Sequence, residues 1–230
     1  MDLQVAGFVP FSTVDYPEHL AAVIFCQGCA FNCHYCQNPE LIPCHSRASW
    51  NPHDWHSIIT FLQQRTNLLD AVVFSGGEPT MQPGLPQAIA EVKKLGFKIG
   101  LHTAGFYPEV LAQILPLLDW VGLDIKAPFS EYASITQVKN SGEKVLASAK
   151  LLLATTTTVR TTIHPNLLTE QQILQLAQDL KKLGVENYQL QKFRAQGCNN
   201  KELCTADLTG YPSQELQEKL SSLFANFKVV

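Results

Sequence analysis

Four of the seven cysteines of this 230-residue chain lie within eleven positions, in the stretch CQGCAFNCHYC at residues 26–36. A structural zinc site usually takes two CxxC pairs separated by a dozen or more residues, whereas the gap between the pairs here is three residues. Four thiolates on so short a loop are hard to arrange around one zinc ion. Cys29, Cys33 and Cys36 can instead hold three corners of an iron–sulfur cube, for which thiolates are the usual ligands. A zinc site and unligated reduced thiols are the alternatives.

An iron–sulfur cube held by three cysteines would leave its fourth iron without a protein ligand and open to a substrate. Tyr35 stands directly before the last of the three cysteines and could shield the cluster from water. The cysteines therefore predict a reactive metal centre, and the rest of the chain must supply the scaffold around it.

Composition excludes several classes of protein. The chain is 46% hydrophobic, which is enough for a sizeable core, and its net charge of −3 offers no basic field for nucleic acid or an anionic membrane surface. No apolar run approaches the ~18 residues of a membrane span, and no basic region precedes an apolar stretch at the start. We therefore expect a cytoplasmic protein, in which an odd number of cysteines does not indicate a disulfide framework.

Apolar runs rich in Val, Ile and Phe alternate with helical patterns along the whole chain. Strands are predicted at 21–25, 71–77, 97–105, 119–128, 157–165 and 187–193, and helices at 56–64, 85–96, 108–115, 142–155, 169–184 and 213–227. Continuous apolar strands alternating with helices are typical of a parallel sheet. A closed eight-fold barrel typically needs about 250 residues, so six units predict an α/β fold with a partial (β/α)6 TIM-like barrel. No linker or repeat interrupts the pattern, which indicates one domain over residues 1–230.

Polar and glycine-rich stretches follow the predicted strands. After the cysteines come SGGEP (75–79), HTAG (102–105), LDIKAP (123–128), IHP (163–165) and QKFRAQG (191–197). Because the carboxyl ends of parallel strands meet at one rim, where sites in such folds are built, we expect these stretches to surround one active site.

The CxxxCx(aromatic)C spacing, with SGGEP and six strand–helix units, resembles the radical S-adenosylmethionine (radical SAM) enzymes. The resemblance runs from about residue 7 to the last predicted strand. Within this superfamily the chain is most similar to the glycyl-radical-enzyme activating proteins, and in particular to the anaerobic ribonucleoside-triphosphate reductase activating protein. The stretches that carry this are FSTVDYPEHLAAVIFCQGCAFNCHYCQNPEL, VVFSGGEPTMQ, LDIKAP and RTTIHPNLLTEQQI.

The resemblance implies an anaerobic oxidoreductase with one 4Fe–4S cluster on Cys29, Cys33 and Cys36 and with S-adenosylmethionine as its cofactor. Such an enzyme reductively cleaves the cofactor to a 5′-deoxyadenosyl radical and installs a glycyl radical on a partner enzyme. A flavodoxin or ferredoxin is the implied electron donor, and no nucleic acid or membrane partner is expected. The alternative is radical chemistry on a small molecule, as in the carboxy-deazaguanine synthases, which commonly have a longer cysteine loop.

The resemblance also implies roles for residues at the rim. Gly76 and Gly77 would let the backbone approach the methionine part of the cofactor, and Glu78 would accept a hydrogen bond from its ammonium group. Lys126 would offset the cofactor carboxylate, and Asp124 would fix nearby polar groups. A tight turn with a surface glutamate, and a surface ion pair, are the structural alternatives.

Weaker assignments concern the remaining rim residues. Asp15, in the Thr-Val-Asp stretch before the first predicted strand, would lie near the incoming glycine segment, with helix capping as the alternative. Thr103 and Gln191 are candidates for cofactor contacts, and Gln191 and Arg194 are candidates for the ribose or the partner. Arg160 is a weaker candidate still, because it could point outward.

The chain departs from the resemblance at one point. Activating proteins often carry Asp-Thr-Asn-Gly after the third strand, where this chain has His102-Thr103-Ala104-Gly105, so we expect no cation site there and interpret His102 as a rim histidine. Cys26 is expected to pack in the core. Cys44, Cys198 and Cys204 are too few for a second cluster, which needs about four ligands.

Overall fold

A computed structural model of the chain describes residues 3–44 and 54–230. Eight strands form one sheet in the order β1 to β8. Strand β1 is antiparallel to β2, and every other neighbouring pair is parallel. The strands are β1 Val5–Ser12, β2 Ala21–Cys26, β3 Ala71–Gly76, β4 Lys98–Thr103, β5 Trp120–Asp124, β6 Thr157–Ile163, β7 Asn187–Lys192 and β8 Asn226–Val229.

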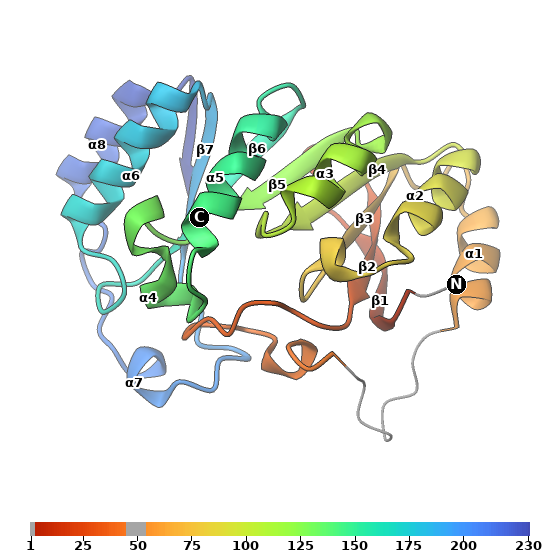
Figure 1. Cartoon of the computed structure of the whole chain (residues 1–230), viewed down its shortest axis with the longest axis horizontal. Coiled ribbons are helices and arrows are strands. Elements are labelled where there is room, and N and C mark those ends of the chain that lie inside the picture. The colour runs from red at the N-terminus through yellow and green to blue at the C-terminus, as the bar shows by residue number, and fades with distance from the viewer. Residues whose placement is uncertain (1–2, 45–53) are drawn as a thin grey trace.

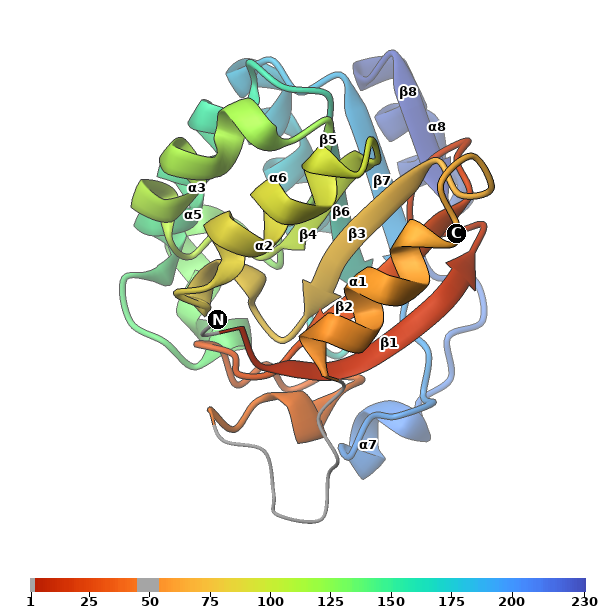
Figure 2. The same ribbon diagram turned by 90° about the vertical axis from the view of Figure 1, so that its right-hand side faces the viewer.

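Helices connect the parallel strands, and most of them lie on the outer side of the curved sheet, whereas α7 lies below the sheet (Figures 1 and 2). They are α1 Trp55–Gln63, α2 Leu85–Lys94, α3 Pro108–Ile114, α4 Tyr132–Thr136, α5 Ser141–Leu152, α6 Glu170–Leu183, α7 Lys201–Cys204 and α8 Gln214–Leu223. Strands β1 and β8 are the two edges of the sheet, so the barrel is partial. The predicted α/β partial barrel is confirmed, with β2 to β7 as its six parallel strands.

Two strands were not predicted from the sequence. Strand β1 contains Gly7 and Pro10, which disfavour a strand and are tolerated here because β1 is an edge strand. The helix predicted at 213–227 is wrong in its last part, because α8 ends at Leu223 and β8 follows. Strand β8 has four residues, of which Phe227 and Val229 are only partly buried, so its apolar pattern is too short to distinguish it from a helix end.

The core has two parts, on the two faces of the sheet. The larger part lies between the sheet and the helices. The smaller part fills the inside of the barrel at the amino ends of the strands, and its buried residues are Tyr16, Ala21, Val23, Ala71, Val73 and Trp120. Gly100 leaves room for the ring of Tyr16, since a Cβ at position 100 would lie 2.9 Å from that ring. The barrel interior is therefore packed shut below the site.

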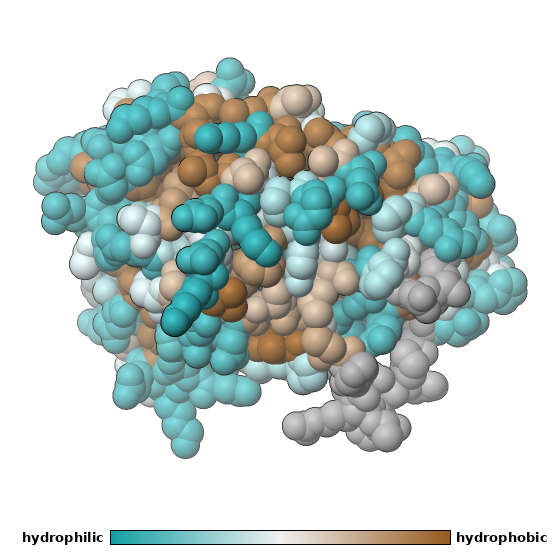
Figure 3. All heavy atoms as spheres, in the orientation of Figure 1, coloured by the Kyte–Doolittle hydropathy of each residue, from teal (hydrophilic) through white to brown (hydrophobic). Residues whose placement is uncertain are grey.

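The outer surface is largely hydrophilic over α6 and α8, as the left side of Figure 3 shows. Helix α6 illustrates how local sequence produces such an element. Thr169 and Gln172 form a capping box at its start, and Gly184 ends it in a left-handed conformation. No helix in the described part of the chain is both long enough and apolar enough to span a membrane.

Candidate active site

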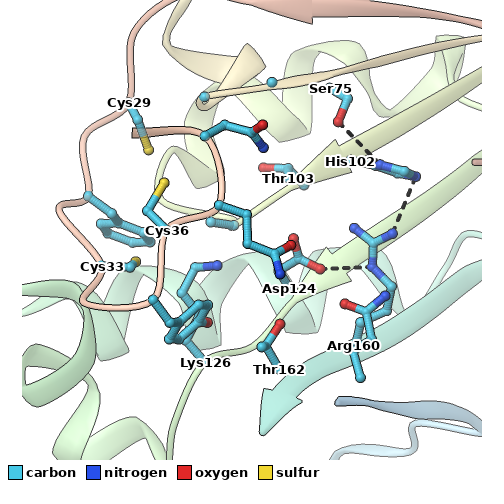
Figure 4. Close-up of a pocket in the computed structure, with 18 of the residues that line it drawn as sticks. Cys29, Cys33, Cys36, Ser75, His102, Thr103, Asp124, Lys126, Arg160 and Thr162 are labelled. Atoms are coloured by element: carbon cyan, nitrogen blue, oxygen red, sulfur yellow. Dashed lines mark hydrogen bonds and ion pairs between the residues drawn. The ribbon is translucent and has the colours of Figure 1, made fainter. Parts of the chain in front are cut away.

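A cavity of about 750 Å³ lies at the carboxyl ends of the strands. All the predicted site residues except Glu78 line it, namely Asp15, Cys29, Cys33, Tyr35, Cys36, Gly76, Gly77, Thr103, Asp124, Lys126 and Gln191. The fold thus brings to one place residues that are spread over most of the sequence. Figure 4 shows the three cysteines on one loop, with Asp124 and Lys126 beside them.

Hydrogen bonds from three other parts of the chain hold the cysteine loop in place. Gly28 and Cys29 donate backbone hydrogen bonds to the carbonyls of residues 41 and 42, at 2.8 and 3.1 Å. The backbone N–H of Asn32 donates to the carbonyl of Thr136 at 3.1 Å. The side chain of Gln37 donates to the carbonyl of residue 194 at 2.7 Å. Three separate parts of the chain therefore fix the loop before any metal binds.

The thiols of the loop suit a cluster better than a single ion. No group of three metal-ligating side chains within the described ranges converges closely enough to hold one metal ion. Cys29, Cys33 and Cys36 nevertheless line the same cavity, as ligands at three corners of a cube would. Burial raises the pKa of Cys29 to about 12 and also raises the pKa of Cys33 and Cys36. The free thiols are therefore protonated at neutral pH, and any metal that they bind must displace their protons.

Gly76 and Gly77 allow a close approach, but its partner is the cysteine loop of the same chain. A Cβ at position 76 would lie 2.4 Å from the backbone nitrogen of Cys26, and one at position 77 would lie 2.1 Å from the carbonyl oxygen of Gly28. Gly76 also has a φ of +112°, which side-chain-bearing residues rarely adopt. The two glycines therefore pack the end of β3 against the start of the cysteine loop, and they line the cavity as well.

Glu78 lies behind the cavity wall. It is 1% exposed, and its carboxylate accepts hydrogen bonds from Thr103 Oγ1 at 2.7 Å, from the N–H of Ala104 at 2.8 Å, and from the hydroxyl and N–H of Thr80. Burial raises its pKa, while these hydrogen bonds oppose that shift. Glu78 thus holds the last residue of β4, Thr103, and the residue that follows it, Ala104. Its predicted contact with the cofactor ammonium stays a prediction.

Lys126 places a cation beside the cysteines. Its Nζ lies 5.6 Å from the centre of the Tyr35 ring, and its backbone N–H donates to the hydroxyl of Tyr132 at 3.0 Å. Burial lowers the pKa of Lys126, but Tyr35, Cys33 and Asp124 outweigh burial and raise the pKa well above its ordinary value. Lys126 is therefore charged, as a partner for a carboxylate must be.

Arg160 on β6 contacts Asp124 on β5 and His102 on β4 along one side of the cavity. Arg160 forms an ion pair with Asp124, with Nε 2.8 Å from Oδ1, and its Nη1 lies 3.4 Å from Nε2 of His102 (Figure 4). Burial raises the pKa of Asp124, but the charges of Arg160 and Lys126 outweigh burial and bring the pKa below its ordinary value. Asp124 is therefore ionised. Arg160 points inward. Asp124 does form an ion pair, but this pair lies inside the cavity, whereas the structural alternative was an ion pair on the surface.

Other sequence assignments fall on different parts of the structure. Cys26 is fully buried in the core, which confirms its packing role. Cys44 is exposed, and neither Cys198 nor Cys204 lines the cavity. His164 is fully buried and contacts the carbonyl of Leu203 at 3.2 Å, away from the cavity.

Two polar residues of the cavity wall were not predicted from the sequence, because they lie within strands and not after them. Thr162 and Gln189 line the cavity from within β6 and β7, before the stretches that follow those strands. A period of two along β6 could have revealed them, because its buried residues alternate with partly exposed polar ones.

The profile of the Radical SAM superfamily matches residues 23–180, which span the cysteine loop and the strands from β2 to β6. This chain belongs to the radical SAM superfamily. The match includes every predicted metal ligand and the SGGEP stretch.

Two curated relatives differ in how much of the chain they match. A protein of Methanocaldococcus jannaschii, whose name assigns it to the glycyl-radical enzyme activating enzymes, is 33% identical over 211 residues, covering 88% of this chain and 85% of its own. The 7-carboxy-7-deazaguanine synthase of Thermococcus kodakarensis is 29% identical over 161 residues, covering 57% of this chain and 63% of its own.

The fold is similar to that of solved radical SAM structures. Streptococcus suis SuiB bound to its precursor peptide SuiA superposes with a TM-score of 0.65 at 16% identity. The match covers 89% of this chain and 47% of SuiB, so this chain spans about half of that protein. At this identity the likeness supports the fold alone.

Proposed function

We propose that this chain, with all 230 residues in one domain, is a radical SAM enzyme that installs a glycyl radical on a partner enzyme of the anaerobic ribonucleotide reductase kind. The observation that carries the proposal is the meeting of three cysteines spaced CxxxCxxC with Lys126 and the glycine turn in one cavity. The longer match to the activating enzyme of M. jannaschii favours a protein substrate over a small one.

Each residue of the cavity has a defined part in this proposal. Cys29, Cys33 and Cys36 would hold one 4Fe–4S cluster, and Lys126 would offset the carboxylate of S-adenosylmethionine. When bound, the cluster and S-adenosylmethionine supply reductive cleavage of a C–S bond to a 5′-deoxyadenosyl radical. Tyr35, which is 6% exposed, would keep water from the cluster. A flavodoxin or ferredoxin would deliver the electron.

Asp15 is assigned to the incoming glycine segment of the partner. Asp15 and the neighbouring Val14 line the cavity, and Val14 is 86% exposed. This segment therefore borders both the cavity and the solvent. Thr103, Asp124 and Gln191 complete the proposed cofactor contacts from β4, β5 and β7. A partner that covers the cavity would supply the exclusion of water that a reactive radical needs.

The test uses anaerobically purified protein with reconstituted cluster. Iron and sulfide content, 5′-deoxyadenosine release and the electron paramagnetic resonance spectrum are measured with and without the glycyl radical enzyme encoded in the same genome. We expect slow cofactor cleavage alone, and a glycine-centred doublet when the partner is added. Efficient, saturable turnover of a small metabolite without a second protein would overturn the proposal in favour of chemistry like that of the carboxy-deazaguanine synthases.

A further inference from the structure

Both ring nitrogens of His102 are engaged, and neither contact is part of the proposed cofactor binding. Nδ1 lies 3.3 Å from the hydroxyl of Ser75 on β3, and Nε2 lies 2.9 Å from the backbone carbonyl oxygen of Asp15 (Figure 4 shows the first contact). His102 on β4 therefore joins the sheet to the segment that follows β1.

The hydrogen-bond partners of His102 determine which ring nitrogen carries the proton. Burial and the charge of Arg160 lower the pKa of His102 to about 4, although Asp124 and Asp15 oppose this, so the ring is neutral at physiological pH. A neutral imidazole has one N–H, and a carbonyl oxygen can only accept. Nε2 must therefore donate to the carbonyl of Asp15 at 2.9 Å, and Nδ1 accepts from the hydroxyl of Ser75. Arg160 Nη1, which can only donate, lies farther away at 3.4 Å and makes no hydrogen bond to Nε2 in this state.

The fold makes room for this arrangement with a glycine. Gly122 on β5 pairs with His102 on β4. A Cβ at position 122 would lie 3.0 Å from Cζ of Arg160 and 3.1 Å from Cδ2 of His102, so glycine is what lets these two side chains meet. Arg160 is itself held by Asp124. The ring of His102 therefore has little freedom to turn away from Asp15.

The segment that contains Val14 and Asp15 is anchored at its end toward the barrel interior and exposed at its other end. Tyr16 is buried in the barrel interior, with its ring centre 5.2 Å from that of Trp120. The carboxylate of Asp15 accepts a hydrogen bond from the hydroxyl of Ser12. Within the described residues, His102 provides the side-chain hydrogen bond that ties the backbone of Asp15 to β4.

We propose that His102 is a positioning residue that holds Val14 and Asp15 at the cavity wall and so sets where the partner's glycine-bearing segment meets the bound cofactor. The inference rests on the proposed function, because it acts through the residue assigned to that segment. His102 itself touches neither the cofactor nor the reacting atoms in this role.

The first test needs no partner. Hydrogen–deuterium exchange of residues 13–19 is compared in the cluster-loaded wild type, His102→Leu and His102→Gln, with His56→Leu on the exposed face of α1 as the matched control. We expect about fivefold faster exchange in His102→Leu, since one hydrogen bond is worth about 1 kcal/mol, and wild-type exchange in His102→Gln, which keeps a donor. Unchanged exchange in His102→Leu would overturn the proposal.

A second variant guards against misfolding of His102→Leu. Gly122→Ala leaves His102 in place but crowds its ring and Arg160, so we expect exchange of residues 13–19 between that of the wild type and that of His102→Leu. Wild-type exchange in a folded Gly122→Ala protein together with wild-type exchange in His102→Leu would count against the hydrogen bond as the anchor.

The second readout is the yield of glycyl radical per 5′-deoxyadenosine formed, measured with the partner enzyme present. We expect this ratio to fall about fivefold in His102→Leu and to recover in His102→Gln, while S-adenosylmethionine affinity stays at the wild-type value. A loss of cofactor affinity would overturn the positioning role. If the wild type forms no glycyl radical, the proposed function fails, whereas the exchange experiment still decides the role of His102.

Discussion

The two walls of the cavity are built differently. On the wall from β2 to β5, the cysteine loop, the glycine turn and the Glu78 carboxylate are fixed by hydrogen bonds and close backbone packing. On the wall from β6 to β7, Arg160 is fixed by its ion pair with Asp124, and the remaining polar side chains are those of Thr162, Gln189, Gln191 and Lys192. No hydrogen bond or ion pair joins these four side chains to another of the described residues. The first wall is suited to one constant ligand, and the second leaves donors and acceptors free for a substrate.

The largest expected effect breaks the first wall at its thiols. Changing Cys29, Cys33 or Cys36 singly to alanine should abolish cluster assembly and cofactor cleavage, because a cube held by two thiolates lacks a ligand. Iron content and 5′-deoxyadenosine release measure both. Cys26→Ala, Cys44→Ala and Cys198→Ala are matched controls that should keep the cluster. An iron-free Cys26→Ala protein with an intact fold would contradict the ligand assignment.

A smaller effect should follow from removing the carboxylate behind the first wall. Glu78→Ala leaves Thr103 and the N–H of Ala104 without their acceptor, and should lower the free energy of unfolding by about 3 kcal/mol. S-adenosylmethionine affinity should fall about ten- to hundredfold while the cluster is kept.

Chemical denaturation and anaerobic titration calorimetry separate the two possible roles of Glu78. The exposed Glu186→Ala is a matched control that should change neither quantity. Lost stability with unchanged affinity would show that Glu78 shapes the wall without contacting the cofactor.

Acid should weaken the first wall at His102, which lies on β4. The unfolded chain binds a proton at this histidine below about pH 6.5, and the folded chain only below about pH 4. The stabilising contribution is therefore complete above pH 6.5 and is lost as the pH falls toward 4, with a total on the order of 1–3 kcal/mol. Urea denaturation of the wild type and of His102→Gln at pH 7.5 and 5.0 measures the difference. An identical pH dependence in both proteins would contradict the neutral, buried histidine.

The smallest effect on stability is expected on the second wall. Gln191→Ala and Gln189→Ala should each change the free energy of unfolding by less than about 0.5 kcal/mol, because neither side chain has a hydrogen-bond partner to lose among residues 3–44 and 54–230. Turnover in the presence of the partner should change more than stability does. A loss above about 1 kcal/mol would show that this wall is also preorganised.

Local patterns in the sequence were enough for the features that depend on local spacing. The six strand–helix units follow from apolar periodicity. The assignment of the three cysteines as ligands, which stays a prediction, rests on a spacing within one loop. Strand β1 was missed because Gly7 and Pro10 hide its pattern, and an edge position cannot be read from a single segment.

The contacts that organise the site join distant parts of the chain. The bond from His102 to the carbonyl of Asp15 spans 87 positions, and the ion pair from Arg160 to Asp124 spans 36. The sequence placed Glu78 at the right strand end, but the direction of its side chain depends on Thr103 and Ala104, which lie on the next unit of the barrel. No local pattern specifies such directions, so they emerge only when the strands are side by side.

The plug of Tyr16, Trp120 and small apolar residues at the amino ends of the strands bears on the kinetics of the proposed reaction. Because side chains fill the barrel at the amino ends of the strands, we expect a cofactor and a protein partner to share the approach from the carboxyl ends. A partner that settled first would block the cofactor's way in. Steady-state kinetics should therefore be ordered, with S-adenosylmethionine adding before the partner and the spent cofactor fragments leaving after the partner has departed.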